Sequence, residues 1–271
     1  MFSSQLAFPM ALVCATLLSA QDVRFVTAPL DVIEKRLGAF AHKNEDHEPA
    51  LRALFDAVGC SANDEERKAR GSKYPNLVCT MPGESAAIIV VGAHYDSVEA
   101  DDGVVDNWSG ASLLPSLYEG LRTASRKHTF EFVGFAGEER GLIGSKGFVN
   151  SWKKTREPIQ AMVNMDTLGL GETEVWVSHA DKNLVDLAVR TAAALNLPMS
   201  GMNVERVGET DSESFREAKI PAITFHSLTS ATLPILHNKK DTLAAMQMEP
   251  YYRSYRLILA YLAALDVTLN Q

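Results

Sequence analysis

The chain has 271 residues, with 26 Lys and Arg against 34 Asp and Glu, so its formal net charge is -8. Hydrophobic residues make up 46% of the chain, which is enough for one full core, and the length is too short for two ordinary domains. Acidic residues outnumber basic ones, and Lys and Arg are scattered along the chain. The chain therefore lacks the basic stripe that is typical of a nucleic-acid-binding protein. Long apolar runs at regular intervals also exclude an intrinsically disordered chain.

The first twenty residues form an uncharged, largely apolar segment. Its apolar run covers residues 6–20 and ends in Leu18-Ser19-Ala20, which is typical of a secretory signal peptide cleaved after Ala20. We therefore expect residues 21–271 to form a single domain that is secreted or periplasmic and has no membrane attachment. An N-terminal membrane anchor is the alternative, but Pro9 interrupts the run, and a helix that spans a bilayer needs about 20 apolar residues.

Two helices are expected after the signal peptide. Apolar residues recur at helical spacing over Asp31–Ala41 and Glu45–Val58, and Gly59 stands where a C-terminal cap is needed. Residues 61–75 hold seven charged side chains together with a glycine and a proline, which predicts an exposed loop.

The chain contains three cysteines. Cys14 lies inside the predicted signal peptide and would be removed with it, which leaves Cys60 and Cys79 as an even pair in an oxidising compartment. We therefore predict a disulfide between Cys60 and Cys79. The alternative is that both remaining thiols are free and buried.

From residue 76 onward, short apolar strands alternate with helices. The strands are rich in β-branched or aromatic residues and are expected at Asn76–Thr80, Ala86–Ala93, Thr129–Ala136, Ala161–Met165, Glu174–Val177 and Ala222–Phe225. Helices are expected at Ser109–Ala124, Leu142–Lys153, Lys182–Leu195, Ser212–Ala218 and Met246–Leu265. Pro115 should kink the first of these helices or delay its start, because an interior proline removes a hydrogen bond and clashes with the preceding turn.

This alternation predicts an α/β fold. We expect a three-layer sandwich, in which a mixed, mostly parallel central sheet has helices on both faces. In such folds the ligand site lies beyond the carboxyl ends of the strands, so residues with a chemical role should come just after strands.

The strand Ala86–Ala93 is followed directly by a histidine and a carboxylate. His94-Tyr95-Asp96 places the two side chains two residues apart, and an Asp that holds the second ring nitrogen of a His is a common arrangement around a metal ligand. On its own, such a pair more often has no function. Asp106 is similar, because by itself it is better explained as the N-terminal cap of the next helix.

Two adjacent glutamates follow the strand Thr129–Ala136. In the segment Gly137-Glu138-Glu139-Arg140-Gly141 neighbouring side chains point to different sides, so one glutamate can bind a metal while the other acts as a general base. The alternative is a solvated acidic pair that stabilises the start of a helix.

Asp166 and His237 complete a set of possible ligands. Asp166 ends an apolar run, and His237 lies between the last predicted strand and the last helix. With His94, Asp106 and Glu139 they supply two imidazoles and three carboxylates at element ends that are predicted to face the same way. Such a set suits two zinc ions that share one bridging carboxylate and a water. Mixed oxygen and nitrogen ligands also accept cobalt or manganese.

Taken together, these motifs resemble those of the bacterial di-zinc aminopeptidases. This zinc exopeptidase family also includes glutamate carboxypeptidase-like ectodomains and glutaminyl cyclases. The matching segments stand in the family's order over about residues 76–245 and comprise 94–97, 106–110, 137–145, 164–166, Thr210-Asp211 with Phe215, and 237–242. The resemblance implies a zinc-exopeptidase-like fold and hydrolysis of peptide substrates at a free N-terminus.

The resemblance also implies which residue binds which ion. One zinc ion would be bound by His94 and Asp166, the other by Glu139 and His237, and Asp106 would bridge the two ions.

Two further roles follow from the same resemblance. Glu138 would be the general base that takes a proton from the bridging water and returns it to the leaving amine, and Asp96 would orient His94. The chain departs from the family at Val207, because many relatives have a tyrosine three residues before the position of Thr210 that helps to hold the oxyanion.

Three other functions remain open. A glutaminyl cyclase uses a similar ligand set with one zinc ion, but the segment 106–110 matches the peptidase form. A carboxypeptidase acting on C-terminal glutamate would need arginines for the substrate carboxylate, and only Arg140, Arg206 and Arg216 lie near the motifs. A receptor-like ectodomain without activity would be expected to lose ligands or the base, which this chain keeps.

Overall fold

The computed structural model describes residues 23–60, 64–68, 71–98, 102–155, 157–203 and 208–269. The predicted signal peptide and Val207 lie outside these residues. The helices are α1 (Leu30–Leu37), α2 (Asn44–Ala57), α3 (Ser109–Ala111), α4 (Leu114–Leu121), α5 (Ile143–Trp152), α6 (Lys182–Leu195), α7 (Ser212–Glu217) and α8 (Met248–Thr268). The strands are β1 (Asp64–Lys68), β2 (Pro75–Met81), β3 (Ile88–His94), β4 (Thr129–Phe135), β5 (Ile159–Met165), β6 (Thr173–Trp176), β7 (Met199–Met202) and β8 (Ala222–His226).

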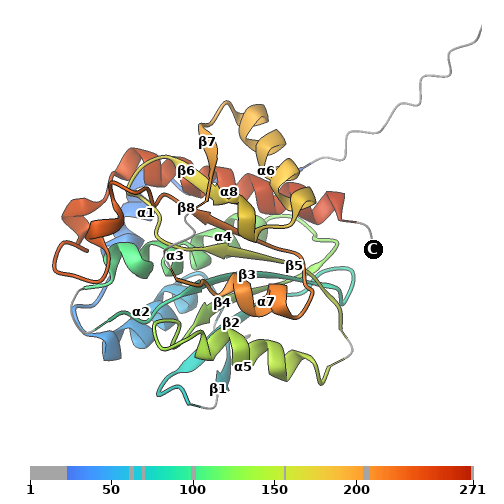
Figure 1. The fold of residues 1–271 in the computed structure, drawn as a ribbon. Helices are drawn as coiled ribbons and strands as arrows, with labels where there is room; N and C mark the ends of the chain where they lie inside the picture. Colours follow the sequence, from blue (N-terminus) through green and yellow to red (C-terminus); the bar gives the residue numbers. More distant parts are fainter. Residues whose placement is uncertain are drawn as a thin grey trace, which may run out of the picture.

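The strands form a single sheet in the order β1-β2-β4-β3-β5-β8-β6-β7. Strand β3 pairs in parallel with β4 and β5, β5 with β8, and β6 with β7, whereas the β1–β2, β2–β4 and β6–β8 pairs are antiparallel. The mixed, mostly parallel sheet predicted from the sequence is therefore confirmed. Because β4, β3, β5 and β8 run in the same direction, their carboxyl ends lie along one edge of the sheet (Figure 1).

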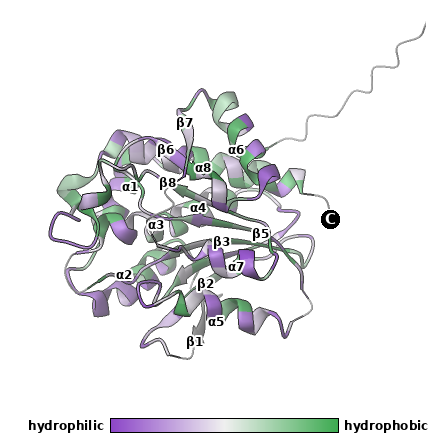
Figure 2. Ribbon diagram, viewed as in Figure 1, coloured by the Kyte–Doolittle hydropathy of each residue, from purple (hydrophilic) through white to green (hydrophobic). Residues whose placement is uncertain are grey.

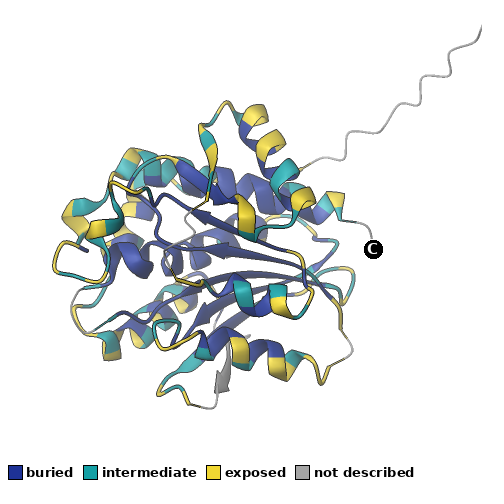
Figure 3. Cartoon of the chain, in the orientation of Figure 1, coloured by how far each residue is buried: buried dark blue, intermediate teal, exposed yellow. Residues whose placement is uncertain are grey.

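Strand β3 illustrates why this sheet needs helices on both faces. All seven of its residues are buried, and successive side chains point to opposite faces of a sheet. Ile89 and Val91 lie in one apolar core, and Ile88 and Val90 in the other. A strand buried on both faces appears in the sequence as a continuous apolar run, which made it easy to predict. Figure 3 shows the central strands buried, and Figure 2 shows hydrophilic residues on the outer helices and loops.

Helices cover both faces of the sheet and complete the three layers. Helices α5 and α7 pack together on one face, and their residues Phe148 and Phe215 lie in the core below the sheet. Helices α1, α2, α4, α6 and α8 cover the other face, where α8 packs against α4 and α6. Among the described residues, no helix combines the length and the apolar character that crossing a membrane requires.

Two edge strands lie where the sequence predicts none. Strand β1 falls inside the predicted loop 61–75 and pairs with β2, and β7 pairs with β6. Their sequences are Asp-Glu-Glu-Arg-Lys and Met-Ser-Gly-Met, so neither contains the apolar run by which strands were predicted. An edge strand is held by main-chain hydrogen bonds to one neighbour and often carries charges, so hydropathy does not reveal it.

The predicted helix Ser109–Ala124 is divided into α3 and α4. Pro115 occupies the first turn of α4, where its missing N–H removes no intrahelical hydrogen bond. The predicted interruption of the helix at this proline is therefore confirmed.

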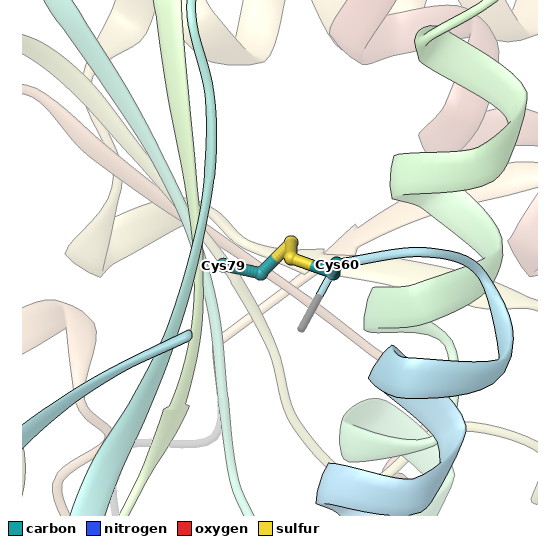
Figure 4. The surroundings of a disulfide bond; sticks show 2 residues. All are labelled: Cys60 and Cys79. Carbon is teal, nitrogen blue, oxygen red and sulfur yellow. A yellow bond between two sulfur atoms is a disulfide. The ribbon is translucent and has the colours of Figure 1, made fainter. Parts of the chain in front are cut away.

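A disulfide joins Cys60 and Cys79 (Figure 4). Cys60 follows α2 and Cys79 lies in β2, with their Cα atoms 6.0 Å apart. Both residues are buried in the core that α2 shares with the sheet. The bond thus links the N-terminal helical layer covalently to the sheet.

Candidate metal centre

His94 is the last residue of β3, and its ring is buried at the carboxyl edge of the sheet. Its Nε2 lies 3.2 Å from Asp106 Oδ1, 3.7 Å from Asp166 Oδ1 and 4.0 Å from Glu138 Oε2. Its other ring nitrogen, Nδ1, lies 3.0 Å from the main-chain oxygen of Asp96. Because Nδ1 donates to this carbonyl, loss of the proton from Nε2 would leave a lone pair that faces the carboxylates, which is the form of the ring that binds a metal.

Asp106 lies between the two predicted histidine ligands. Its Oδ1 faces His94, and its Oδ2 lies 3.2 Å from His237 Nε2. The residue belongs to the irregular turn Val104–Trp108, and the Asp106–Asn107 peptide bond is cis. The carboxylate therefore presents a different oxygen to each histidine, which is the arrangement expected of a bridging ligand.

Asp96 holds the turn that carries the two glutamates. Its carboxylate accepts hydrogen bonds from the backbone N–H groups of Gly137, Glu138 and Glu139, at 2.8, 3.0 and 3.3 Å. Gly137 has a φ of 76°, which glycine adopts without strain, and the chain turns out of β4 there. The Asp96 carboxylate is 3.8 Å from His94 Nδ1, so Asp96 orients the imidazole through its main-chain oxygen rather than through its carboxylate.

The structure brings all five predicted ligands and Glu138 together. Glu139 Oε2 lies 3.3 Å from His237 Nε2, whereas Glu138 faces His94. Two groups of three possible ligands result, with the ligand atoms of each group within 4.8 Å of one another. The groups are His94, Glu138 and Asp166, and Asp106, Glu139 and His237. Three imidazole or carboxylate ligands with a position left open is the pattern of a catalytic zinc site, so these residues fit zinc.

Negative charge exceeds positive charge in this cluster. Burial would raise the pKa of Asp106, but hydrogen bonds from His237 and His94 outweigh it and hold that pKa well below its usual range. Burial, followed by the nearby charge of Asp106, raises the pKa of Glu139 to about 7. Burial also raises the pKa of Glu138 well above its ordinary value. The carboxyl groups thus compete for protons, and a divalent cation would relieve this competition.

Two residues outside the predicted ligand set hold the turn around Asp106. Asp241 accepts hydrogen bonds from the backbone N–H groups of Val105 and Asp106, at 2.6 and 3.0 Å. The Asn107 side chain accepts from the Thr167 N–H at 3.2 Å and donates to the main-chain oxygen of Met165 at 2.9 Å. Both residues lie inside the segments that resemble the aminopeptidase motifs, and this was the only indication of their importance in the sequence. Their roles could not be predicted, because they depend on contacts between distant segments.

Asp211 is a further acidic residue beside this cluster. It is fully buried, and burial raises its pKa to about 7. Phe215, from the same motif, lies in the core between α5, α7 and the sheet rather than at the site. The motif therefore contributes one buried acid and one packing residue.

Both ligand groups contribute to one cavity of about 490 Å³. Besides the acidic residues and His237, its walls include Trp176, Thr210, Thr224, His226 and Leu228. The possible ligands therefore lie next to a space that can hold a small organic substrate.

Residues 76–262 match Peptidase family M28. The chain is 25% identical over 244 residues to a probable leucine aminopeptidase of Trichophyton verrucosum, an alignment that covers 81% of this chain and 63% of that protein. The chain thus spans less than two thirds of the length of this relative.

Two solved structures show the same fold. The Legionella pneumophila LapA aminopeptidase matches with a TM-score of 0.78 at 24% identity, covering 89% of this chain and 73% of that one. An Acidobacteriales bacterium glutaminyl cyclase matches with a TM-score of 0.73 at 17% identity, covering 88% and 93%. Because the family match extends from β2 to α8 and includes more than half of the chain, this protein belongs to peptidase family M28.

Proposed function

We propose that the chain is a metallo-aminopeptidase that binds two zinc ions and hydrolyses the first bond of peptides with a free N-terminus. The observation that carries the proposal is the position of Asp106, whose two oxygens face His94 and His237 separately, with Glu138 beside His94. Membership of peptidase family M28 and the aminopeptidase names of the relatives support it.

The six acidic and imidazole groups would have two roles, metal binding and general base catalysis. His94 and Asp166 would hold one ion, Glu139 and His237 the other, and Asp106 would give one oxygen to each. When bound, the ions would supply Lewis acidity for the scissile carbonyl and make water a nucleophile near neutral pH.

Glu138 would then be the general base. Asp106 can replace it as the third ligand beside His94 and Asp166, because Asp106 Oδ1 is the closer carboxylate oxygen to His94. Glu138 is thus available to take a proton from the attacking water and to return it to the leaving amine. Burial raises the pKa of Glu138 well above its usual value, so its carboxylate takes up a proton more readily than that of an exposed glutamate.

The disulfide supports export of this enzyme from the cytoplasm. Disulfides persist in the periplasm and outside the cell and are rare in the cytosol. We therefore propose a secreted or periplasmic location, in agreement with the expected signal peptide. Sequencing the N-terminus of the protein recovered outside the cytoplasm tests this, and a start at Gln21 is expected.

A glutaminyl cyclase is the second candidate, because this chain spans 93% of the matched cyclase chain. A carboxypeptidase is less well supported. Arg216 is paired with Glu213 and His179, and Arg140 lines a separate cavity with Lys43. Arg206 lies outside the described residues.

Metal content and activity separate these functions. We expect about two zinc ions per chain by inductively coupled plasma mass spectrometry, and release of the anilide from leucyl-anilide that stops after chelation. One zinc ion with pyroglutamate formation would instead identify a cyclase, and a chain without metal would reject the site.

A matched pair of variants tests the bridging residue. Asp106→Asn should lower the zinc content below two per chain, because it removes the shared ligand. Asp186→Asn alters a half-exposed carboxylate on α6 and should leave the zinc content unchanged. Equal zinc content in both variants would contradict the proposed bridge.

A further inference from the structure

The cavity at the metal centre extends along a part of the sheet that the ligand groups do not use. Strands β6 and β8 are antiparallel neighbours in which Glu174 lies opposite His226. Continued by two residues, this register places Trp176 opposite Thr224, and the alternation of side chains puts all four on one face. Thr224, His226 and Trp176 line the same cavity as Asp106.

Two buried ring nitrogens on this face are hydrogen-bond donors without an acceptor. His226 and Trp176 are each 5% exposed, and within the described residues neither His226 Nε2 nor Trp176 Nε1 has a partner. His226 Nδ1 accepts the N–H of Leu228 at 3.1 Å, so the neutral imidazole carries its proton on Nε2. The indole nitrogen of Trp176 is a donor only.

The other two tryptophans of the chain both have an acceptor for the ring N–H. Trp108 Nε1 donates to the main-chain oxygen of Leu37 at 3.0 Å, and Trp152 Nε1 donates to that of Glu157 at 2.6 Å. A buried donor without an acceptor is unfavourable, because burial removes its hydrogen bonds to water. A native structure keeps such groups where a ligand completes them or where they serve another function.

The donors on this wall offer hydrogen bonds rather than charge. Burial lowers the pKa of His226 to about 4, so its ring is neutral at neutral pH. Leu228 also lines the cavity, and a group bound there would contact apolar carbon atoms around the two donors. The complementary ligand is a short aliphatic chain that ends in an acceptor oxygen.

We propose that His226 and Trp176 select the substrate by its first side chain, favouring one that ends in an acceptor oxygen over an apolar one. This inference rests on the proposed function, because the first residue of a peptide cleaved at the metal centre would occupy this cavity. Asparagine and aspartate are close to leucine in size, but only they can accept a hydrogen bond at the end of the side chain. Leucine would leave both donors unpaired.

Anilides of matched amino acids test this preference. We expect kcat/KM for the asparaginyl or the aspartyl anilide to exceed that for the leucyl anilide by about tenfold or more. The glutaminyl, glutamyl and methionyl anilides form a second matched set with a longer side chain. Comparing amide with carboxylate within each set identifies which acceptor oxygen the pocket prefers.

Substitutions of His226 and Trp176 test whether these two donors cause the preference for an acceptor-bearing side chain. His226→Leu and Trp176→Phe each remove a donor and keep an apolar side chain, so each should lower the preference over leucine by about tenfold. His226→Gln keeps an N–H donor at a similar distance and should retain most of it. Thermal melting and zinc content of each variant show whether it has folded and loaded normally.

The outcomes distinguish this inference from the function on which it rests. Release of leucyl-anilide at least as fast as the acceptor-bearing anilides would overturn the inference and leave the aminopeptidase intact. An acceptor preference that survives unchanged in both His226→Leu and Trp176→Phe would also overturn it. Release of none of the anilides by the zinc-loaded protein would reject the proposed function and the inference together.

Discussion

Each end of strand β4 lies next to a buried histidine and at least one carboxylate, but the two clusters differ in the number of carboxylates. At the amino end, His128 Nδ1 lies 3.2 Å from Asp266 Oδ1, and the backbone N–H groups of Lys127 and His128 donate to the same carboxylate at 3.2 and 2.9 Å. One carboxylate there has an imidazole and two N–H groups as partners. It ties the end of α8 to the start of β4.

At the carboxyl end, two imidazoles face four carboxylates. Asp106 contacts both His94 and His237, and Glu138, Glu139 and Asp166 lie around them. Burial raises the pKa of Glu139 to about 7, because its charged form is not fully compensated. The comparison teaches that a single buried carboxylate surrounded by hydrogen-bond donors supports the fold, whereas several buried carboxylates close together indicate a site that a ligand completes.

The largest effect should come from the base at the carboxyl end. Glu138→Gln removes the proton acceptor and keeps the shape of the side chain, so kcat should fall by about 10³-fold while zinc remains bound. Steady-state hydrolysis of an aminoacyl anilide and metal analysis of the same sample measure both. Glu249→Gln, which alters an exposed glutamate on α8, is the matched control. Full activity of zinc-loaded Glu138→Gln would exclude the assigned role.

The next largest effect belongs to the single carboxylate at the amino end. Asp266→Ala removes the carboxylate that lies beside His128 Nδ1 and accepts the backbone N–H groups of Lys127 and His128, so the free energy of unfolding should fall by about 3 kcal/mol. Urea denaturation measures this, and zinc content should stay at the level of the unsubstituted protein. If Asp266→Ala lost zinc but not stability, the amino end of β4 would serve metal binding rather than the fold, which would contradict the comparison.

Zinc should stabilise the carboxyl end by a comparable amount. At free zinc 100-fold above the dissociation constant, each bound ion adds about 2.7 kcal/mol to the free energy of unfolding. The melting temperature of the chelated protein should therefore rise with added zinc, and Asp106→Asn should reduce the rise. A melting temperature that does not respond to zinc would show that the excess carboxylates serve another purpose.

The smallest effect concerns how the stability of the chelated protein depends on pH. The pKa of Glu139 is raised in the folded state, so the folded protein binds this proton more tightly than the unfolded chain, and stability falls as pH rises from 4.5 toward 7. Glu139→Gln should therefore stabilise the chelated protein more at pH 8, where the carboxyl group is ionised in both states, than at pH 4, where it is mostly protonated in both states. Thermal or urea unfolding at both pH values measures the difference. A variant that is less stable at pH 8 would contradict the charge excess.

The sequence alone was sufficient for the middle strands and for the candidate ligands. Strand β3 is a continuous apolar run that ends at His94, because both of its faces are buried, and β5 ends before Asp166 for the same reason. Strand β1 could not be predicted, because its five residues are all charged and only pairing with β2 makes them a strand.

The amino-acid sequence by itself determined the α/β fold and the set of residues at the carboxyl edge, because burial leaves a periodic pattern along the chain. Only the tertiary structure decided how these residues meet. The contact of Asp241 with the Asp106 turn joins residues more than 130 positions apart, and the unpaired donors of His226 and Trp176 come from different strands. Such contacts depend on distances between segments, and hydropathy carries no information about those distances.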